Sequence, residues 1–477
     1  MLRTVLVALT LGGAVPRTEA ATAKESGPAM VLPFIEDNFA AAQAKAKSAG
    51  KLLVVDAWAL WCHTCLSMRN FVFTDPILKE VADRFVYASI DTEQPTSTAF
   101  TGRFPITTWP TLLVLDPRRS EASAEEQVVA RWTGAMTARE LLLRLRELSG
   151  PQPAHEPLLA QADAAAETGR WSEAASLYEK AAQQPAARAQ ARLGQIQALR
   201  ETDKAACAAL ADSVFDELGK SALATDFAAY AADCQGSLTD VDQRQKLRSR
   251  LRTRLERLVQ DERAELLADD RSDGYGTLTE LADALGDAPA GDRYAVRRAE
   301  LLEAAAKAAA NPAAAATFDA HRLEAYRRLK RYGVAEAMLL GSRKALPGDY
   351  NPPARLARLY HEMGRLDAAL VQINQAIALC AGPRRIGMYE LRASIQHGLG
   401  RTPEAIQSIQ TAITMVQEQT KPGAKRPGKL ASLEKMLAAL ISTQPPSSAV
   451  AAQVPGDTTD KKPPRPARKV AKRDTVH

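Results

Sequence analysis

The chain has 477 residues, more than one domain needs, since folded domains commonly hold roughly 100–200 residues. Its 46% hydrophobic and 25% charged residues are typical of a soluble globular protein, and they exclude a wholly disordered chain or a polytopic membrane protein. Segment 461–473 carries seven Lys and Arg and no acid, so removing its charge from the net +6 leaves −1 for the rest. The basic character therefore belongs to a tail, which argues against nucleic acid as a partner.

The first residues have the layout of a secretory signal peptide. Arg3 precedes an apolar stretch from about Val5 to Val15, and small residues then follow at the spacing of a cleavage site. This stretch is too short for a membrane-spanning helix. We expect residues 1–23 to be a cleaved signal peptide and the mature chain to be periplasmic or secreted. An uncleaved anchor or a buried strand is the alternative interpretation.

Residues 31–149 show the alternating strands and helices of an α/β domain. Residues 34–50 predict a helix that ends at Gly50, and residues 137–148 predict a closing amphipathic helix. Apolar, β-branched runs predict strands at 52–59, 85–90, 111–115 and 128–132.

Cys62 and Cys65 follow the first of these strands, at the start of a helix. At this spacing the two cysteines can close a small disulfide ring, and the positive end of the helix dipole would stabilise a Cys62 thiolate. That thiolate can attack a substrate disulfide, and Cys65 can resolve the mixed disulfide. His63, if protonated, would stabilise the thiolate further and make the pair more oxidising.

Other residues fit the same chemistry. Asp56 lies in the middle of the apolar strand before Cys62, where a buried acid is costly unless it has a partner or a role such as proton exchange with Cys65. Pro110 follows Trp109 at a strand entrance, where a cis peptide bond could bring backbone beside the cysteines. Trp58 and Trp61 are expected to line the site.

Each of these interpretations has a simpler rival. The cysteine pair could be half of a zinc site, although no second Cys-x-x-Cys or Cys/His pair accompanies it. His63 could be a solvated loop residue, Asp56 a salt-bridged strand residue, and Trp109 a packing residue. The domain could also keep its cysteines for a purely structural role.

The segments VVDAWALWCHTC, TTWPTLLVLD and RWTGAMTARELL resemble the thioredoxin family. Within that family, WCHTCLSMRNFVFTDPILKEVADRFV is most similar to the C-terminal periplasmic domain of the disulfide-reducing transporter DsbD and its relatives. The resemblance implies that Cys62 attacks, Cys65 resolves, Asp56 is the buried acid and Pro110 is a cis-proline that contacts substrate. The expected substrate-binding residues are Trp61, His63, Thr64, Trp109 and Pro110.

Two departures from the family pattern bear on the direction of electron flow. His-Thr between the cysteines matches none of the dipeptides of thioredoxin, the strong oxidants or the isomerases. The electron-carrying transmembrane segment of DsbD is absent from the sequence, so a reductant of this type needs an external electron source, such as a membrane donor.

The rest of the chain predicts helices in repeated pairs. Motifs around Gly364 and Gly400 recur with a shift of 36 residues, and an earlier copy surrounds Gly169. These units resemble tetratricopeptide repeats, whose concave surfaces bind proteins or peptides. The expected segments are a linker at 150–157, repeats at 158–236, a helical region with degenerate repeats at 237–320, repeats at 321–418, a terminal helix region at 419–441 and a disordered basic tail at 442–477.

No catalytic constellation is visible in these helices. The charged stretch around residues 243–267 predicts a long solvated helix, and the isolated histidines are expected to be surface or packing residues: His321, His361 and His397. Cys207 and Cys234 could pair in an exported chain, although buried free thiols are favoured, and Cys380 is left alone.

The sequence thus predicts an exported thiol–disulfide oxidoreductase that acts on protein thiols and disulfides and needs neither cofactor nor metal. The fold class is an α/β thioredoxin-like domain followed by an all-α solenoid that binds a partner protein or peptide. The resemblance favours reduction and His63 favours oxidation. The alternative is a repeat-based periplasmic scaffold or chaperone whose thioredoxin-like domain is a docking or redox-sensing module.

Overall fold

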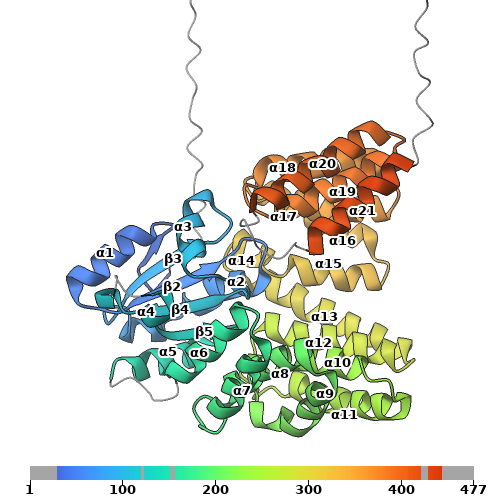
Figure 1. Cartoon of the computed structure of the whole chain (residues 1–477). Coiled ribbons are helices and arrows are strands. Elements are labelled where there is room, and N and C mark those ends of the chain that lie inside the picture. The colour runs from blue at the N-terminus through green and yellow to red at the C-terminus, as the bar shows by residue number, and fades with distance from the viewer. Residues whose placement is uncertain (1–29, 120–122, 151–155, 420–427, 443–477) are drawn as a thin grey trace, which may run out of the picture.

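The computed structural model describes residues 30–119, 123–150, 156–419 and 428–442. In these ranges a part built on one β-sheet is followed by a long array of helices (Figure 1). The expected signal peptide, residues 151–155 of the expected linker, and the expected tail beyond Ser442 lie outside the described residues. Among the described helices, none combines the length and the apolar character needed to cross a lipid bilayer.

The N-terminal part contains a five-stranded mixed sheet in the order β1-β3-β2-β4-β5. The pairs β1–β3 and β2–β3 are parallel, whereas β2–β4 and β4–β5 are antiparallel. All four strands expected from the sequence are present. Residues 34–36, expected to begin a helix, instead form an edge strand, because they pair with residues 87–89 of the neighbouring strand. Three residues are too few to show an alternating pattern in the sequence. The strands are β1 (Phe34–Glu36), β2 (Leu53–Trp58), β3 (Val86–Asp91), β4 (Thr111–Leu115) and β5 (Val128–Thr133).

Helices cover both faces of this sheet. On one face, α1 (Phe39–Ala49) and α3 (Thr98–Arg103) pack on the odd-numbered residues of β2, Leu53 and Val55. The other face carries α2 (His63–Ser67), the π-helix η1 (Met68–Val72) and α5 (Ala138–Leu148). Since side chains alternate along a strand, the even-numbered Asp56 lies on the face that α2 and η1 cover.

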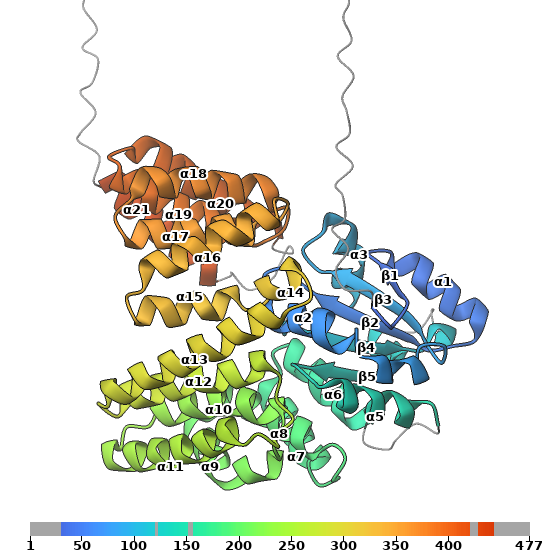
Figure 2. The same ribbon diagram turned by 180° about the vertical axis from the view of Figure 1, so that it is seen from behind.

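From residue 156 onward, consecutive helices pack against each other along the chain. Figures 1 and 2 show the array arching from the edge strand β5 round to the C-terminal helices. The helices are α6 (Glu156–Glu167), α7 (Trp171–Ala181), α8 (Arg188–Thr202), α9 (Lys204–Val214), α10 (Ala222–Gly236), α11 (Val241–Gln260), α12 (Ala268–Ala284), α13 (Ala288–Ala308), α14 (Pro312–Ala316), α15 (Asp319–Arg328), α16 (Tyr332–Ala345), α17 (Asn351–Glu362), α18 (Leu366–Leu379), α19 (Arg385–Gly398), α20 (Thr402–Gln419) and α21 (Gly428–Ser442).

A left-handed residue turns the chain within several of these helix pairs. Gly169, Gly364 and Gly400 have φ values of 75°, 72° and 73°, which glycine adopts without steric penalty. Lys330 has φ 56° in the turn between α15 and α16, 34 positions before Gly364. The degenerate repeat therefore keeps the turn of the clear repeats although it has lost their glycine.

Two expectations about the helical part are wrong. Helix α11 is not solvated all round, because leucines at intervals of four residues bury one face, among them Leu247, Leu251 and Leu255. Cys207 on α9 and Cys234 on α10 form a disulfide, with Cα atoms 5.7 Å apart, instead of the favoured free thiols. Their separation of 27 residues hid the fact that α9 and α10 pack against each other.

The helical array packs against the sheet part on the side that carries the two cysteines. Helix α6 lies along β5, α12 contacts α2, and α14 contacts η1. Phe71 stacks on Phe318 with ring centroids 5.5 Å apart, and Asn70 Nδ2 donates to Thr317 Oγ1 at 3.1 Å. This packing places α10, α12 and α15 next to the start of α2.

The close packing of α12 on α11 gives a prediction about Gly274. A Cβ atom added there would lie 2.4 Å from Val259 Cγ1, so Gly274→Ala is expected to lower the free energy of unfolding by about 1–3 kcal/mol through overpacking. Gly341→Ala in α16 is the matched control, because nothing lies within 4 Å of its added Cβ atom. Alanine there should raise stability by about 0.5–1 kcal/mol. Urea unfolding followed by circular dichroism measures both, and a stabilising Gly274→Ala would contradict the packing argument.

Candidate active site

Cys62 and Cys65 form a disulfide at the start of α2, with Cα atoms 5.2 Å apart. Cys62 is the N-cap residue, and its Sγ accepts a hydrogen bond from the backbone N–H of Cys65 at 3.0 Å. Cys65 is fully buried, and Cys62 is 4% exposed. Since an N-terminal helix position and an N–H donor both favour negative charge, Cys62 is the sulfur better placed to become a thiolate.

Three tryptophans surround this disulfide. Trp58, Trp61 and Trp109 pack against a buried cluster that contains both cysteines. Trp61 meets Trp109 edge to face with centroids 5.4 Å apart, and Trp109 Nε1 donates to Thr92 Oγ1 at 2.8 Å. The peptide bond from Trp109 to Pro110 is cis, as the sequence suggested.

Asp56 is buried on β2, and its carboxylate interacts with Arg69 and Ser89. Arg69 Nη1 lies 3.5 Å from Asp56 Oδ2, and Ser89 Oγ donates to the same oxygen at 3.5 Å. The Arg69 guanidinium also lies 4.1 Å from the Trp58 ring centroid and pairs with Glu36. Burial raises the pKa of Asp56 to about 7, although Arg69 opposes the shift. Arg69 was not predicted as a site residue; its signal in the sequence is a cation within the apolar stretch LSMRNFVF.

His63 is held by carboxylates from the helical array. Its Nδ1 lies 3.0 Å from Asp269 Oδ2 on α12 and 3.3 Å from Thr64 Oγ1. Burial lowers the pKa of His63, but the carboxylates of Asp269 and Asp273 outweigh it and raise the pKa to about 9. His63 is therefore a paired residue and not a solvated loop residue.

His321 lies beside His63, contrary to the prediction that it is isolated. It is buried on α15, and its ring lies 3.9 Å from the ring of His63. Burial, followed by the charges of His63 and Arg298, keeps the pKa of His321 well below its usual range. Nothing in the sequence links residues 63 and 321, so His321 was wrongly expected to be isolated.

A group of acids that sequence reasoning missed lies on α10 and α12 beside His63. Asp269 and Asp270 are buried in the first turn of α12, and Asp273 follows one turn later. Burial raises the pKa of Asp226, on α10, to about 6 and that of Asp273 to about 7, while His63 opposes both shifts. The available signal was the run ADDRSD, which reads as ordinary acidic capping of a helix N-terminus.

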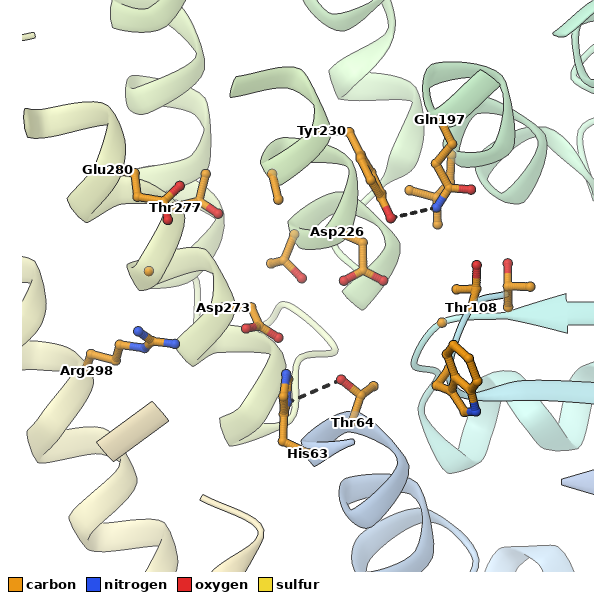
Figure 3. Close-up of a pocket in the computed structure, with 17 residues that line it drawn as sticks. His63, Thr64, Thr108, Gln197, Asp226, Tyr230, Asp273, Thr277, Glu280 and Arg298 are labelled. Atoms are coloured by element: carbon orange, nitrogen blue, oxygen red, sulfur yellow. Dashed lines mark hydrogen bonds between the residues drawn. The ribbon is translucent and has the colours of Figure 1, made fainter. Parts of the chain in front are cut away.

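Two cavities open beside the cysteine loop, with His63 on the wall of both. Figure 3 shows the first, of about 350 Å³, where His63 and Thr64 face Asp226, Asp273 and Tyr230. Thr108 and Trp109 also line this cavity. The second cavity, of about 610 Å³, is lined by Trp61 and by a group of cations from the C-terminal helices: Arg327, Arg355, Arg358, Arg384 and Lys429.

The N-terminal part of the chain is a thioredoxin-like domain: a family model described as thioredoxin-like matches residues 35–117. The chain is 31% identical over 108 residues to the thiol:disulfide interchange protein DsbD of Tatumella citrea, an alignment that covers 22% of this chain and 18% of that protein. DsbD of Pseudoalteromonas atlantica is 33% identical over 104 residues, covering 21% and 17%. The chain thus spans less than a fifth of the length of these curated relatives.

The helical array is of the tetratricopeptide type. Similar solved structures include a tetratricopeptide repeat protein from Parabacteroides merdae, at 13% identity and TM-score 0.38, covering 60% of this chain and 98% of that one. BtubC from P. vanneervenii is another, at 15% identity and TM-score 0.31, covering 51% and 94%. Because both TM-scores are low, the repeat type rests on the motif spacing and the turn geometry described above.

Proposed function

We propose that the protein is an exported thiol–disulfide oxidoreductase that acts on disulfides of other proteins. In the reducing direction the Cys62 thiolate attacks one substrate sulfur, the substrate S–S bond breaks, and one substrate thiolate leaves. Cys65 then attacks Cys62 Sγ and releases the second substrate thiolate. The substrate gains two electrons and two protons, and the enzyme keeps the Cys62–Cys65 disulfide until an external dithiol reduces it.

The observation that carries this proposal is the environment of Cys62. Its sulfur sits at a helix N-terminus, accepts the Cys65 N–H and lies among three tryptophans beside two cavities. In this proposal Asp56 exchanges a proton with Cys65. Trp61, Thr64, Trp109 and Pro110 position the substrate chain beside Cys62.

The acids on α12 support the reducing direction. A protonated His63 alone would stabilise the Cys62 thiolate and make the pair oxidising. Asp269 pairs with His63 at 3.0 Å, and the carboxylate of Asp273 also acts on His63. This charge offsets the imidazolium, destabilises a thiolate and so makes the dithiol a stronger reductant.

The test is the reduction potential of Cys62–Cys65 in the full chain. The protein is equilibrated with glutathione and dithiothreitol buffers, its thiols are alkylated, and each cysteine peptide is quantified by mass spectrometry. A potential near about −270 mV supports a reductant. A potential near about −120 mV would mean that the protein oxidises its substrates instead of reducing them. A potential below about −300 mV, where structural disulfides lie, would contradict an enzymatic role. The Cys207–Cys234 disulfide is the internal reference in the same digest.

The second candidate function is a scaffold or chaperone built on the helical array. The contacts between α2 and α12 favour it, because they cover part of the surface through which a free thioredoxin domain would meet a partner. In that case the second cavity holds a partner segment, and the cysteine pair is a docking or sensing element. Holdase activity that is independent of both cysteines would support this candidate.

A further inference from the structure

Three side chains from separate elements meet next to the cysteine loop. They are His63 on α2, Asp273 on α12 and His321 on α15, and one potential ligand atom from each lies within 4.8 Å of the other two. His321 Nε2 is 3.2 Å from Asp273 Oδ1. Figure 3 shows a ring nitrogen of His63 directed toward the Asp273 carboxylate. Such convergence of two imidazoles and one carboxylate is a donor set that divalent transition metals use.

The groups behind these side chains fix how the imidazoles face. Asp269 Oδ2 lies 3.0 Å from Nδ1 of His63, and Asp269 Oδ1 lies 3.6 Å from Nδ1 of His321. Ser272 Oγ is 3.0 Å from the same His321 nitrogen. Metal-binding histidines commonly give one ring N–H to a carboxylate and bind the metal with the other nitrogen. Asp269 thus holds the His63 ring and Ser272 holds the His321 ring, each at Nδ1, and both Nε2 atoms are left for a ligand.

Asp269 places a buried carboxylate beside both histidines. Its side chain has no exposed surface, and its Oδ1 has no hydrogen-bond partner. An unsatisfied buried carboxylate oxygen is costly. If a metal held the Nε2 atoms of His63 and His321, both Nδ1 atoms would carry protons. Asp269 Oδ2 would accept the proton of His63, Ser272 Oγ would accept that of His321, and the negative Asp269 Oδ1 would lie 3.6 Å from the latter.

We propose that His63, Asp273 and His321 bind a divalent transition-metal ion of the zinc type, with Asp269 as the carboxylate that orients His63. Three protein ligands leave a fourth position for water or another small ligand, as in open tetrahedral sites. Nitrogen donors favour zinc-type ions over calcium and magnesium, which prefer all-oxygen sites. Because the ligands come from both parts of the chain, the bound ion ties α2 to α12 and α15. The site uses no cysteine, so it differs from the half-site that the Cys-x-x-Cys spacing alone suggested.

The test is a titration of the full chain, oxidised so that no cysteine of the active pair is a thiolate, with Co²⁺ followed by Zn²⁺ competition. We expect one Co²⁺ per chain, visible d–d absorption without sulfur-to-metal charge-transfer bands, and displacement by Zn²⁺. His321→Ala and His63→Ala are each expected to weaken Zn²⁺ binding by on the order of 100-fold, and Asp269→Asn by about 10–100-fold. His397→Ala, an exposed histidine away from the cluster, is the matched control.

Three outcomes would overturn the proposal. The first is no binding at one equivalent in the oxidised protein, and the second is binding only after reduction, which would make the thiolates the ligands. The third is affinity unchanged in both His321→Ala and His63→Ala, which would mean adventitious surface binding. The two substitutions lie on different elements. Circular dichroism of each variant distinguishes loss of a metal ligand from misfolding. All readouts use the disulfide form, so they do not depend on redox activity.

Discussion

Replacing Cys62 with serine is expected to lower the disulfide reductase activity of the full chain by about 10³-fold or more, because the attacking nucleophile is lost. Replacing Cys65 with serine should instead leave the attack intact and block resolution. That variant should therefore accumulate mixed disulfides through Cys62. A disulfide peptide with dithiothreitol as electron donor measures the rate, and non-reducing mass spectrometry detects the trapped species.

Cys380 supplies the matched control for this pair of variants. It is a buried free cysteine whose pKa burial raises to about 11, so its thiol is inert near neutral pH. Cys380→Ser should leave the rate unchanged. In cells, full function of a Cys62→Ala strain at unchanged protein abundance would contradict the enzymatic role and support the scaffold.

Asp56→Asn is expected to slow resolution of the mixed disulfide by roughly 10–100-fold near pH 7, because an amide cannot accept the Cys65 proton. The carboxylate must be ionised to act as the base. The wild-type rate should therefore rise as pH passes the Asp56 pKa of about 7, and this inflection should be absent from the variant. Single-turnover kinetics between pH 5 and pH 9 measure both profiles. A variant profile that matches the wild type would remove Asp56 from the proton pathway.

The same substitution should increase stability. A carboxyl whose pKa is raised in the folded state binds its proton more tightly there than in the unfolded chain. Its contribution is therefore fully present below the unfolded pKa of 3.8 and is lost as pH rises through about 7. Asp56→Asn should thus stabilise the protein most above pH 7, as measured by urea unfolding.

Asp116 is the control of opposite sign for this stability prediction. It accepts a hydrogen bond from Arg118 Nε at 2.9 Å, and this contact holds the pKa of Asp116 below its usual range. Its stabilising contribution is present above the unfolded pKa and lost as pH falls. Asp116→Asn should therefore destabilise the protein at pH 7, where Asp56→Asn stabilises it.

The parts of this molecule that the sequence predicted are those encoded locally. The β2 run before Cys62 is continuously apolar, and the Cys-x-x-Cys spacing and the Trp-Pro-Thr strand entrance lie within short segments. The repeat turns also recur at a fixed distance, so the spacing of Gly364 and Gly400 predicts them. In contrast, the three residues of β1 become a strand only because β3 lies beside them.

The surroundings of the cysteines could not be predicted, because they depend on tertiary contacts. Asp269 and His321 reach His63 only through the packing of α12 and α15 on α2, and a single sequence does not reveal that packing. Arg69 was hidden for a similar reason, since its pairing with Asp56 requires η1 to cross the face of β2. The thiol–disulfide chemistry of Cys62 and Cys65 could be predicted from the sequence. The charged residues that surround them and change the stability of the Cys62 thiolate could not.

The contacts between the cysteine loop and the helical array can form only late in synthesis of the chain. Asn351 Nδ2 donates to the carbonyl of Leu60 at 3.1 Å across a separation of 291 residues. At a synthesis rate of about 5–20 residues per second, Leu60 is made roughly 15–60 s before its partner. During that interval a folded N-terminal domain presents its cysteines without the covering helices. The surroundings of Leu60 and His63 are therefore complete only in the finished molecule, in which α17 and α12 lie beside them.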